Sequence, residues 1–188
     1  DYALEYNGFL TGFRVSVRDA LQNDAWDAVT VQQASHASFD YGSYQPYLET
    51  LAAYIRTYAP GAELLVHQTW AYEEGAERLR EMGFAHARDM FAQVEAAYAR
   101  AAELLGARLI PAGRAVQRAA EAGLARMHRD GYHLSLGAGR YLAACVWLES
   151  VFGVSCRGSA FAETAEALPP ELRAALETVA HETVRENA

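Results

Sequence analysis

Short apolar runs with the composition of β-strands alternate along this chain with longer stretches in which apolar residues recur every three or four positions. The short runs occupy residues 26–33, 64–68 and 108–111, and residues 48–58 and 84–105 lie between them with helical spacing. Strands that alternate with helices of this length pair in parallel through right-handed crossovers. We therefore predict an α/β fold, a three-layer α/β/α sandwich built on a parallel sheet.

Further helical patterns lie near both ends of the chain. Residues 115–127 and 136–152 have helical spacing, and residues 169–185 form an amphipathic tail. Near the start, aromatic and aliphatic residues alternate loosely around Asn7-Gly8, which indicates a hairpin or an irregular cover. A short helix is expected to follow at 16–21.

Length and composition favour a single domain. The chain has 188 residues, of which 52% are hydrophobic, and this is enough for one well-filled core. We expect residues 1–188 to form one domain, with 154–188 as a C-terminal helical extension. Cys145 lies in an apolar helical pattern and Cys156 follows a glycine, so we expect buried free thiols rather than a disulfide.

The charge of the chain limits its partners. The net charge is −8 and the arginines are scattered among acidic residues, whereas nucleic acids and anionic membranes require clustered basic residues. No apolar run is long enough to span a bilayer, and the first residues lack the pattern of a signal peptide. We expect a soluble protein that binds neither nucleic acid nor membrane. It would be cytoplasmic as the sequence stands, and exported if a signal peptide was removed upstream.

Polar residues follow each predicted strand. They are Gln32-Gln33-Ala34-Ser35, Gln68-Thr69-Trp70 and Pro111-Ala112-Gly113. In parallel α/β sheets, ligands bind beyond the carboxyl ends of the strands. We therefore expect these residues to line one edge of the sheet and to form part of a binding site.

A later loop, Asp130-Gly131-Tyr132-His133, carries a carboxylate and an imidazole three residues apart. An imidazole that is oriented by a carboxylate can deprotonate a serine hydroxyl at neutral pH. Two readings remain open: Asp130 and His133 form such a pair, or the aspartate caps a turn and the histidine only packs.

Four motifs in order resemble the SGNH, or GDSL-like, hydrolase superfamily, specifically a bacterial branch described as a domain of unknown function. The resemblance covers roughly residues 15 to 150 and rests on more than any single motif. The motifs are Trp26-Asp27-x-Val29-x-x-Gln32-Gln33-x-Ser35, His67-Gln68-Thr69-Trp70-Ala71-Tyr72, Ile110-Pro111-x-Gly113-x-Ala115 and Asp130-Gly131-Tyr132-His133-Leu134-Ser135. It implies the flavodoxin-like SGNH fold and hydrolysis of esters.

The resemblance implies that His133 is the general base, that Asp130 orients it, and that Gln33 replaces an asparagine of the oxyanion hole. The superfamily's nucleophile block, Gly-Asp-Ser or Gly-Asn-Ser, is absent from the chain. We therefore expect a fragment that lacks its first strand or strands and is inactive by itself, with the edge of the strand at 29–33 bare unless residues 1–20 cover it. Ser35 is a possible substitute nucleophile, although a turn-forming serine is the simpler interpretation.

By the same resemblance, the substrate would be an O-acyl ester, most plausibly an acetylated carbohydrate or a similar small ester. The residues expected to line the substrate site are Gln32, Gln68, Trp70, Tyr72 and Tyr132. The three aromatic rings can stack on a sugar, although ordinary partial burial explains them equally well. The alternative is a non-catalytic carbohydrate-binding protein of the same fold.

No cofactor is expected. The histidines lack metal-ligand spacing, so we predict no metal site, and no glycine-rich loop joins a strand to a helix as in nucleotide binders. The glutamate-rich stretches at 73–81 and 163–186 are expected to be solvated helix faces.

Overall fold

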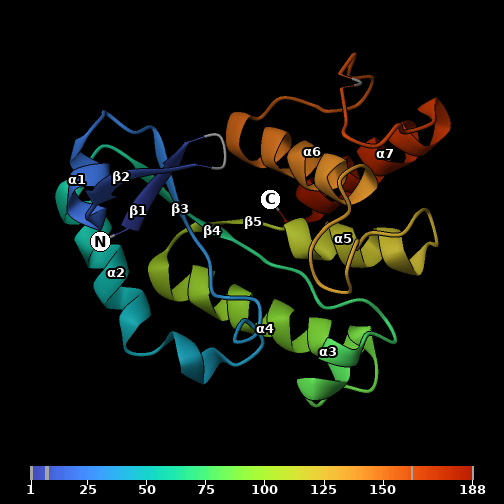
Figure 1. The fold of residues 1–188 in the computed structure, drawn as a ribbon, viewed down its shortest axis with the longest axis horizontal. Helices are drawn as coiled ribbons and strands as arrows, with labels where there is room; N and C mark the ends of the chain where they lie inside the picture. Colours follow the sequence, from blue (N-terminus) through green and yellow to red (C-terminus); the bar gives the residue numbers. More distant parts are fainter. Residues whose placement is uncertain (1, 7–8, 162, 188) are drawn as a thin grey trace.

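The computed structural model describes residues 2–6, 9–161 and 163–187. Three parallel strands form the central sheet in the order β3-β4-β5: β3 (Ala28–Val31), β4 (Glu63–His67) and β5 (Arg108–Ile110) (Figure 1). Helices flank this sheet, and the predicted α/β fold is therefore confirmed. All three strands end at the same edge because they run in parallel.

Seven α-helices and one 3₁₀ helix are found within the described residues. They are α1 (Val17–Gln22), η1 (Tyr41–Tyr44), α2 (Tyr47–Tyr58), α3 (Glu77–Glu81), α4 (Ala87–Leu105), α5 (Ala112–Glu121), α6 (Ala138–Phe152) and α7 (Pro170–Asn187). Figure 1 shows α2 and α4 on one side of the sheet, and α6 and α7 on the other.

The side chains of the middle strand explain this layering. Successive residues of a strand point to opposite faces. Leu64 and Val66 join the apolar core formed with α2 and α4, whereas Leu65 joins the core formed with α5, α6 and α7. A strand buried on both faces needs a continuous apolar run, and this is why β4 has no polar residue between Glu63 and His67.

Most helix boundaries agree with the predictions, but the helix expected at 115–127 is wrong at both ends. Helix α5 begins at Ala112 and ends at Glu121. The chain leaves the helix at Gly123, whose φ of +63° is a left-handed conformation that other residues rarely adopt. The residues that follow form the loop that carries Asp130.

The N-terminal segment forms an antiparallel hairpin of β1 (Tyr2–Tyr6) and β2 (Phe9–Val15), and this two-stranded sheet is separate from the central one. The predicted Asn7-Gly8 turn lies outside the described residues. Because the hairpin does not pair with β3, that strand is an edge of the central sheet in the described part of the chain.

Two other expectations concern the cysteines and the membrane. Cys145 and Cys156 are both free and buried. No helix in the described ranges is both long and apolar enough to cross a bilayer.

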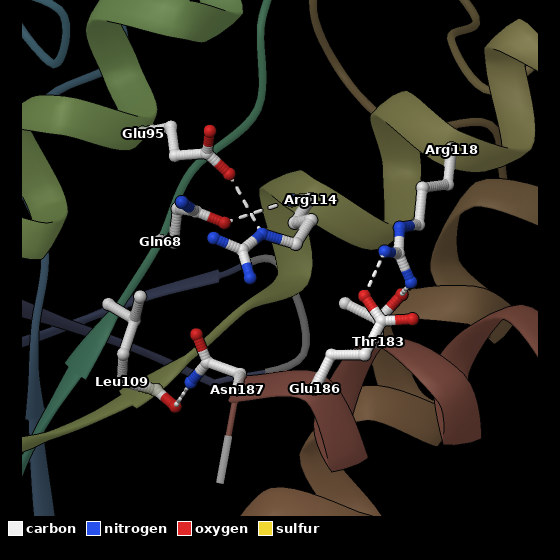
Figure 2. A network of polar contacts seen from close by, with 8 residues as sticks. All are labelled: Gln68, Glu95, Leu109, Arg114, Arg118, Thr183, Glu186 and Asn187. Carbon is white, nitrogen blue, oxygen red and sulfur yellow. Dashed lines mark hydrogen bonds and ion pairs between the residues drawn. The ribbon is translucent and has the colours of Figure 1, made fainter.

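Close packing holds the start of α5 against the end of β4. A Cβ atom on Gly113 would lie only 2.0 Å from the carbonyl oxygen of Thr69, so this position requires glycine. The Gln68 side-chain oxygen accepts the Arg114 backbone N–H at 2.9 Å, and the Arg114 guanidinium binds Glu95 of α4 at 2.8 Å (Figure 2). These contacts fix the carboxyl edge of the sheet where a site was predicted.

The same close-up shows how α7 joins this region. Arg118 of α5 binds Thr183 and Glu186 of α7, and the Asn187 side chain donates to the Leu109 carbonyl oxygen at 3.5 Å (Figure 2). The predicted C-terminal extension is therefore packed against α5, α6 and the sheet, and its buried residues include Leu176 and Ala180.

Candidate active site

The loop between α5 and α6 is closed by its own backbone. His128 and Leu134 form an isolated antiparallel bridge, and the Ser135 N–H donates to the Met127 carbonyl at 2.8 Å. At the tip, Gly131 has a φ of +89°, and its carbonyl accepts the Glu73 N–H at 2.7 Å. This tight loop brings Asp130 and His133 together and ties them to the segment after β4.

Asp130 holds His133 by two contacts. Its Oδ2 lies 2.8 Å from the imidazole Nδ1, and its Oδ1 accepts the backbone N–H of His133 at 2.9 Å. The hydrogen bonds from the side chain and backbone of His133 keep the pKa of Asp130 well below its usual range. Asp130 is therefore a carboxylate at neutral pH, and this favours the tautomer of His133 with the proton on Nδ1.

The Nε2 atom of His133 is the chemically available end of this pair. It makes no hydrogen bond within the described residues, and the His133 side chain is 48% exposed. With the Nδ1 proton directed at Asp130, Nε2 presents a lone pair to incoming groups. The arrangement can accept a proton from a hydroxyl and return it later, which is the chemistry of a general base.

An aromatic cluster, Trp70, Tyr72 and Tyr132, supports His133. The Tyr132 ring packs on the imidazole with 3.9 Å between centroids and meets the Tyr72 ring at 5.8 Å. The Trp70 indole N–H donates to the Tyr132 carbonyl at 2.7 Å. The segment after β4 therefore positions the Asp130–His133 loop. Tyr72 is only 1% exposed, and Trp70 and Tyr132 are half-buried.

Ser35 contacts the aromatic cluster through Tyr72, but it does not contact His133. Its hydroxyl lies 3.3 Å from the Tyr72 hydroxyl, and its carbonyl accepts the Ser38 hydroxyl at 2.9 Å. The surrounding chain makes a turn, in which the Ala37 N–H bonds to the Ala34 carbonyl at 2.9 Å. Ser35 therefore lies in a turn, no hydrogen bond joins it to His133 in the described part of the chain, and its role as a nucleophile stays a prediction.

Gln33 has its side-chain amide bound within its own loop. The amide nitrogen donates to the carbonyl and hydroxyl oxygens of Ser43, both at 3.1 Å, and the amide oxygen accepts the Ala34 N–H at 2.8 Å. Its backbone N–H donates to the Tyr98 hydroxyl at 3.1 Å. Gln33 can serve an oxyanion only if its amide gives up a contact with Ser43, so this role stays a prediction.

The other two glutamines that were predicted to line the site, Gln32 and Gln68, lie on opposite faces of the sheet. Gln32 accepts the Nδ1 proton of His67 at 2.7 Å, on the side of α6, where Trp147 packs against His67. Gln68 is fully buried, its side-chain oxygen accepts the backbone N–H of Arg114 in α5, and its amide nitrogen has no partner among the described residues. Their proposed contacts with substrate remain predictions, since the structure gives both side chains a structural partner.

Burial controls the charge of the histidine at the end of β4. Desolvation lowers the pKa of His67 to about 4, so the ring is neutral at pH 7. Because Gln32 supplies an acceptor at Nδ1, the unprotonated Nε2 is left buried without a partner in the described structure. Across the same residues, no group of three or more His, Cys, Asp or Glu side chains is arranged to hold a metal ion.

Sequence reasoning missed Arg78. Its guanidinium lies 4.3 Å from the Tyr132 ring centre and 5.9 Å from that of Tyr72. It belongs to α3, a five-residue helix inside the stretch that was expected to be only a solvated face. No local signal identifies it, because its ring partner Tyr132 is distant in the sequence.

A parallel sheet between helices, with an Asp–His pair in a loop beside its carboxyl edge, defines an α/β protein of the SGNH-hydrolase fold. The chain belongs to the family described as "Domain of unknown function (DUF4886)", which matches residues 7–176. This match agrees with the predicted branch that is described as a domain of unknown function.

Solved structures agree with this assignment. A DUF4886 family protein from Bacteroides uniformis is 34% identical with a TM-score of 0.83, covering 90% of this chain and 66% of that one. The present chain therefore spans about two thirds of that relative's length. A protein from Slackia heliotrinireducens, provisionally assigned as an SGNH hydrolase, is 30% identical with a TM-score of 0.57, covering 71% of this chain and 70% of that one.

A weaker likeness is to a protein from Parabacteroides merdae that is provisionally assigned as a GDSL-like lipase. It is 19% identical with a TM-score of 0.49, covering 66% of this chain and 59% of that one. A comparison with curated proteins finds no match.

Proposed function

We propose that the protein is a serine ester hydrolase in which His133 is the general base and Asp130 its orienting carboxylate. The observation that carries this proposal is the 2.8 Å contact between Asp130 Oδ2 and His133 Nδ1, which leaves Nε2 unpartnered within the described residues. The neighbour from Slackia heliotrinireducens, provisionally assigned as an SGNH hydrolase, supports the same chemistry.

In the proposed reaction, His133 Nε2 takes the hydroxyl proton of a serine while the serine oxygen attacks the acyl carbonyl carbon. The tetrahedral intermediate collapses, the ester C–O bond breaks, and the imidazolium returns its proton to the leaving alcohol. Water then repeats the sequence on the acyl-serine and releases the acid. Asp130 stabilises the positive charge on His133 during each proton transfer.

The proposal leaves the nucleophile to experiment, with Ser35 as the candidate within the described residues. Its hydroxyl already meets Tyr72, whose ring contacts Tyr132 beside His133. Gln33 is proposed as the oxyanion donor because it follows β3 at the carboxyl edge of the sheet. The proposed substrate is an O-acyl ester, such as an acetylated carbohydrate.

The test measures release of p-nitrophenol from p-nitrophenyl acetate. Because the Bacteroides uniformis relative is longer than this chain, the assay uses the natural full-length protein and the 188-residue chain side by side. We expect His133→Ala to abolish turnover and Asp130→Asn to lower kcat by about two to four orders of magnitude. His36→Ala, which removes an exposed histidine, is the matched control.

Ser35→Ala separates the two sources of the nucleophile. Loss of turnover with an unchanged far-UV spectrum would assign the serine role to Ser35, and retention would place the nucleophile elsewhere. Turnover that survives His133→Ala would refute the proposal.

A non-catalytic glycan-binding role is the second candidate, and two half-buried rings favour it: Tyr132 in the loop and Trp70, which is bonded to it. Such rings present both an apolar face and a polar edge to a sugar. Binding of acetylated oligosaccharides by the natural full-length protein, lowered by Trp70→Ala and without any release of acetate, would establish this role in place of hydrolysis.

A further inference from the structure

The guanidinium of Arg78 lies one aromatic ring away from the proposed base. It is 4.3 Å from the centre of the Tyr132 ring, and His133 also packs on that ring, with 3.9 Å between the Tyr132 and His133 ring centres. Tyr72 contributes a second ring at 5.9 Å. Arg78 therefore belongs to the rim of the candidate active site although it comes from a separate helix.

Arg78 differs from nearby arginines because it has no acceptor. Within the described residues it forms neither an ion pair nor a side-chain hydrogen bond, and it is exposed. By contrast, Arg80 of the same helix donates to the Gly75 carbonyl at 2.7 Å, and Arg126 binds the Glu73 carboxylate at 2.6 and 2.8 Å. In a chain with a net charge of −8, a positive group without a carboxylate partner beside the site is notable.

Contact with the rings limits the freedom of the guanidinium but consumes none of its N–H donors. A guanidinium held against an aromatic ring keeps N–H groups along its edge, where they can bind two oxygens of one anion. Since the ring contacts reduce the entropy that Arg78 must lose on binding, the group is preorganised for a carboxylate or a phosphate. Its exposure means that salt will weaken the interaction.

We propose that Arg78 binds an anionic group, a carboxylate or phosphate, on the substrate and so determines specificity for negatively charged esters. This inference rests on the proposed function, because it names the substrate class of the same site. Candidate substrates are acylated acidic sugars and related esters that carry a negative charge near the scissile bond. A neutral acetylated sugar would lack the partner for Arg78.

The test compares three aryl acetates of similar size: 4-acetoxybenzoate, 4-acetoxyphenyl phosphate and the neutral 4-acetoxybenzamide. We expect the natural full-length protein to prefer at least one anionic ester by about five- to twentyfold in kcat/KM, the range expected for one charge-assisted contact. Comparing the two anionic esters distinguishes a site for carboxylates from a site for phosphates. The preference should fall as salt is raised from about 50 to 500 mM.

Arg78→Met keeps most of the side-chain length and removes the charge. It should lower the ratio of kcat/KM for the anionic ester to kcat/KM for the amide by about the same five- to twentyfold, which removes the preference. Arg78→Lys should keep part of the preference because it retains the charge but loses the planar fork. The matched control is Arg80→Met in the same helix, which should retain the preference.

Binding of the products separates failure of this inference from failure of the proposed function. The dissociation constants of 4-hydroxybenzoate, 4-hydroxyphenyl phosphate and 4-hydroxybenzamide are measured by titration calorimetry, with no turnover required. If no ester is hydrolysed but an anion binds more tightly than the amide and Arg78→Met removes the difference, the anion site stands and the hydrolase proposal fails. The Arg78 inference is overturned if esters are hydrolysed but neither the natural protein nor Arg78→Met distinguishes anionic from neutral compounds in kcat/KM or in dissociation constant.

Discussion

His67 should make the stability of the protein fall as the pH is lowered below the ordinary pKa of histidine. Its ring is packed at the end of β4 between Gln32 and Trp147, and burial lowers its pKa to about 4. In the unfolded chain the pKa is about 6.5. Between these two values the unfolded state binds a proton that the native state does not, so the stabilising contribution is complete above pH 6.5 and is lost as the pH falls toward 4.

The pKa difference sets the magnitude. One pKa unit corresponds to about 1.4 kcal/mol, so a histidine that titrates at about 4 when folded and about 6.5 when unfolded costs about 2 kcal/mol of unfolding free energy at pH 5 relative to pH 7.5. Carboxylates whose pKa is lowered in the native state, such as Glu73 hydrogen-bonded to Arg126, also lose a stabilising contribution in acid, and comparison with a variant cancels this effect. His67→Gln is suitable because its amide can still donate to Gln32.

The assay is urea unfolding of the wild type and His67→Gln at pH 7.5, 6.5, 5.5 and 5.0. We expect the stability of the variant relative to the wild type to rise by about 2 kcal/mol between pH 7.5 and 5.0. His36→Gln removes an exposed histidine and should follow the wild-type profile. A difference between His67→Gln and wild type that stays constant across this range, within about 0.5 kcal/mol, would refute the reasoning.

Two further predictions concern packing and buried charge. Gly113→Ala places a Cβ 2.0 Å from the Thr69 carbonyl oxygen and should lower the free energy of unfolding by about 3 kcal/mol or more in urea titrations. Gly61→Ala is the control, because its Cβ enters open space, and it should lower the free energy of unfolding by less than about 1 kcal/mol. Glu177→Ala removes the carboxylate that accepts one buried and one partly buried hydrogen bond, both at 2.7 Å, and should cost about 3 kcal/mol in the same assay, while Glu171→Ala, at an exposed position of the same helix, should be nearly neutral. A Glu177→Ala protein as stable as the control would show that these bonds contribute little.

The periodicity of apolar residues in the sequence was sufficient to predict the layers of the fold. The apolar run at Leu64–Val66 buries side chains on both faces of the sheet, and the spacing of Met90, Val94 and Tyr98 places them on one buried side of α4. The end of α5 was predicted too late because the apolar pattern continues through Met127. The left-handed conformation of Gly123 ends the helix first.

The same distinction applies to the candidate site. The short spacing of Asp130 and His133 made their contact predictable, because a tight loop brings residues three apart within hydrogen-bonding distance. The amide of Gln33 was expected to be available, but the fold brings Ser43 against it. Only the tertiary structure could supply that competitor, since a side chain bonds whatever acceptor the folded chain places beside it.

Local spacing therefore determined which segments are strands and which are helices, and it brought Asp130 and His133 together, because these features depend on residues that are neighbours in the chain. Tertiary structure alone decided that Arg78 packs on Tyr132 beside His133, that Ser35 meets Tyr72, and that His67 is desolvated. Those relations join distant segments. They depend on how loops from different strands and helices meet at one edge of the sheet, and the energies of burial and charge there exist only after the chain has folded.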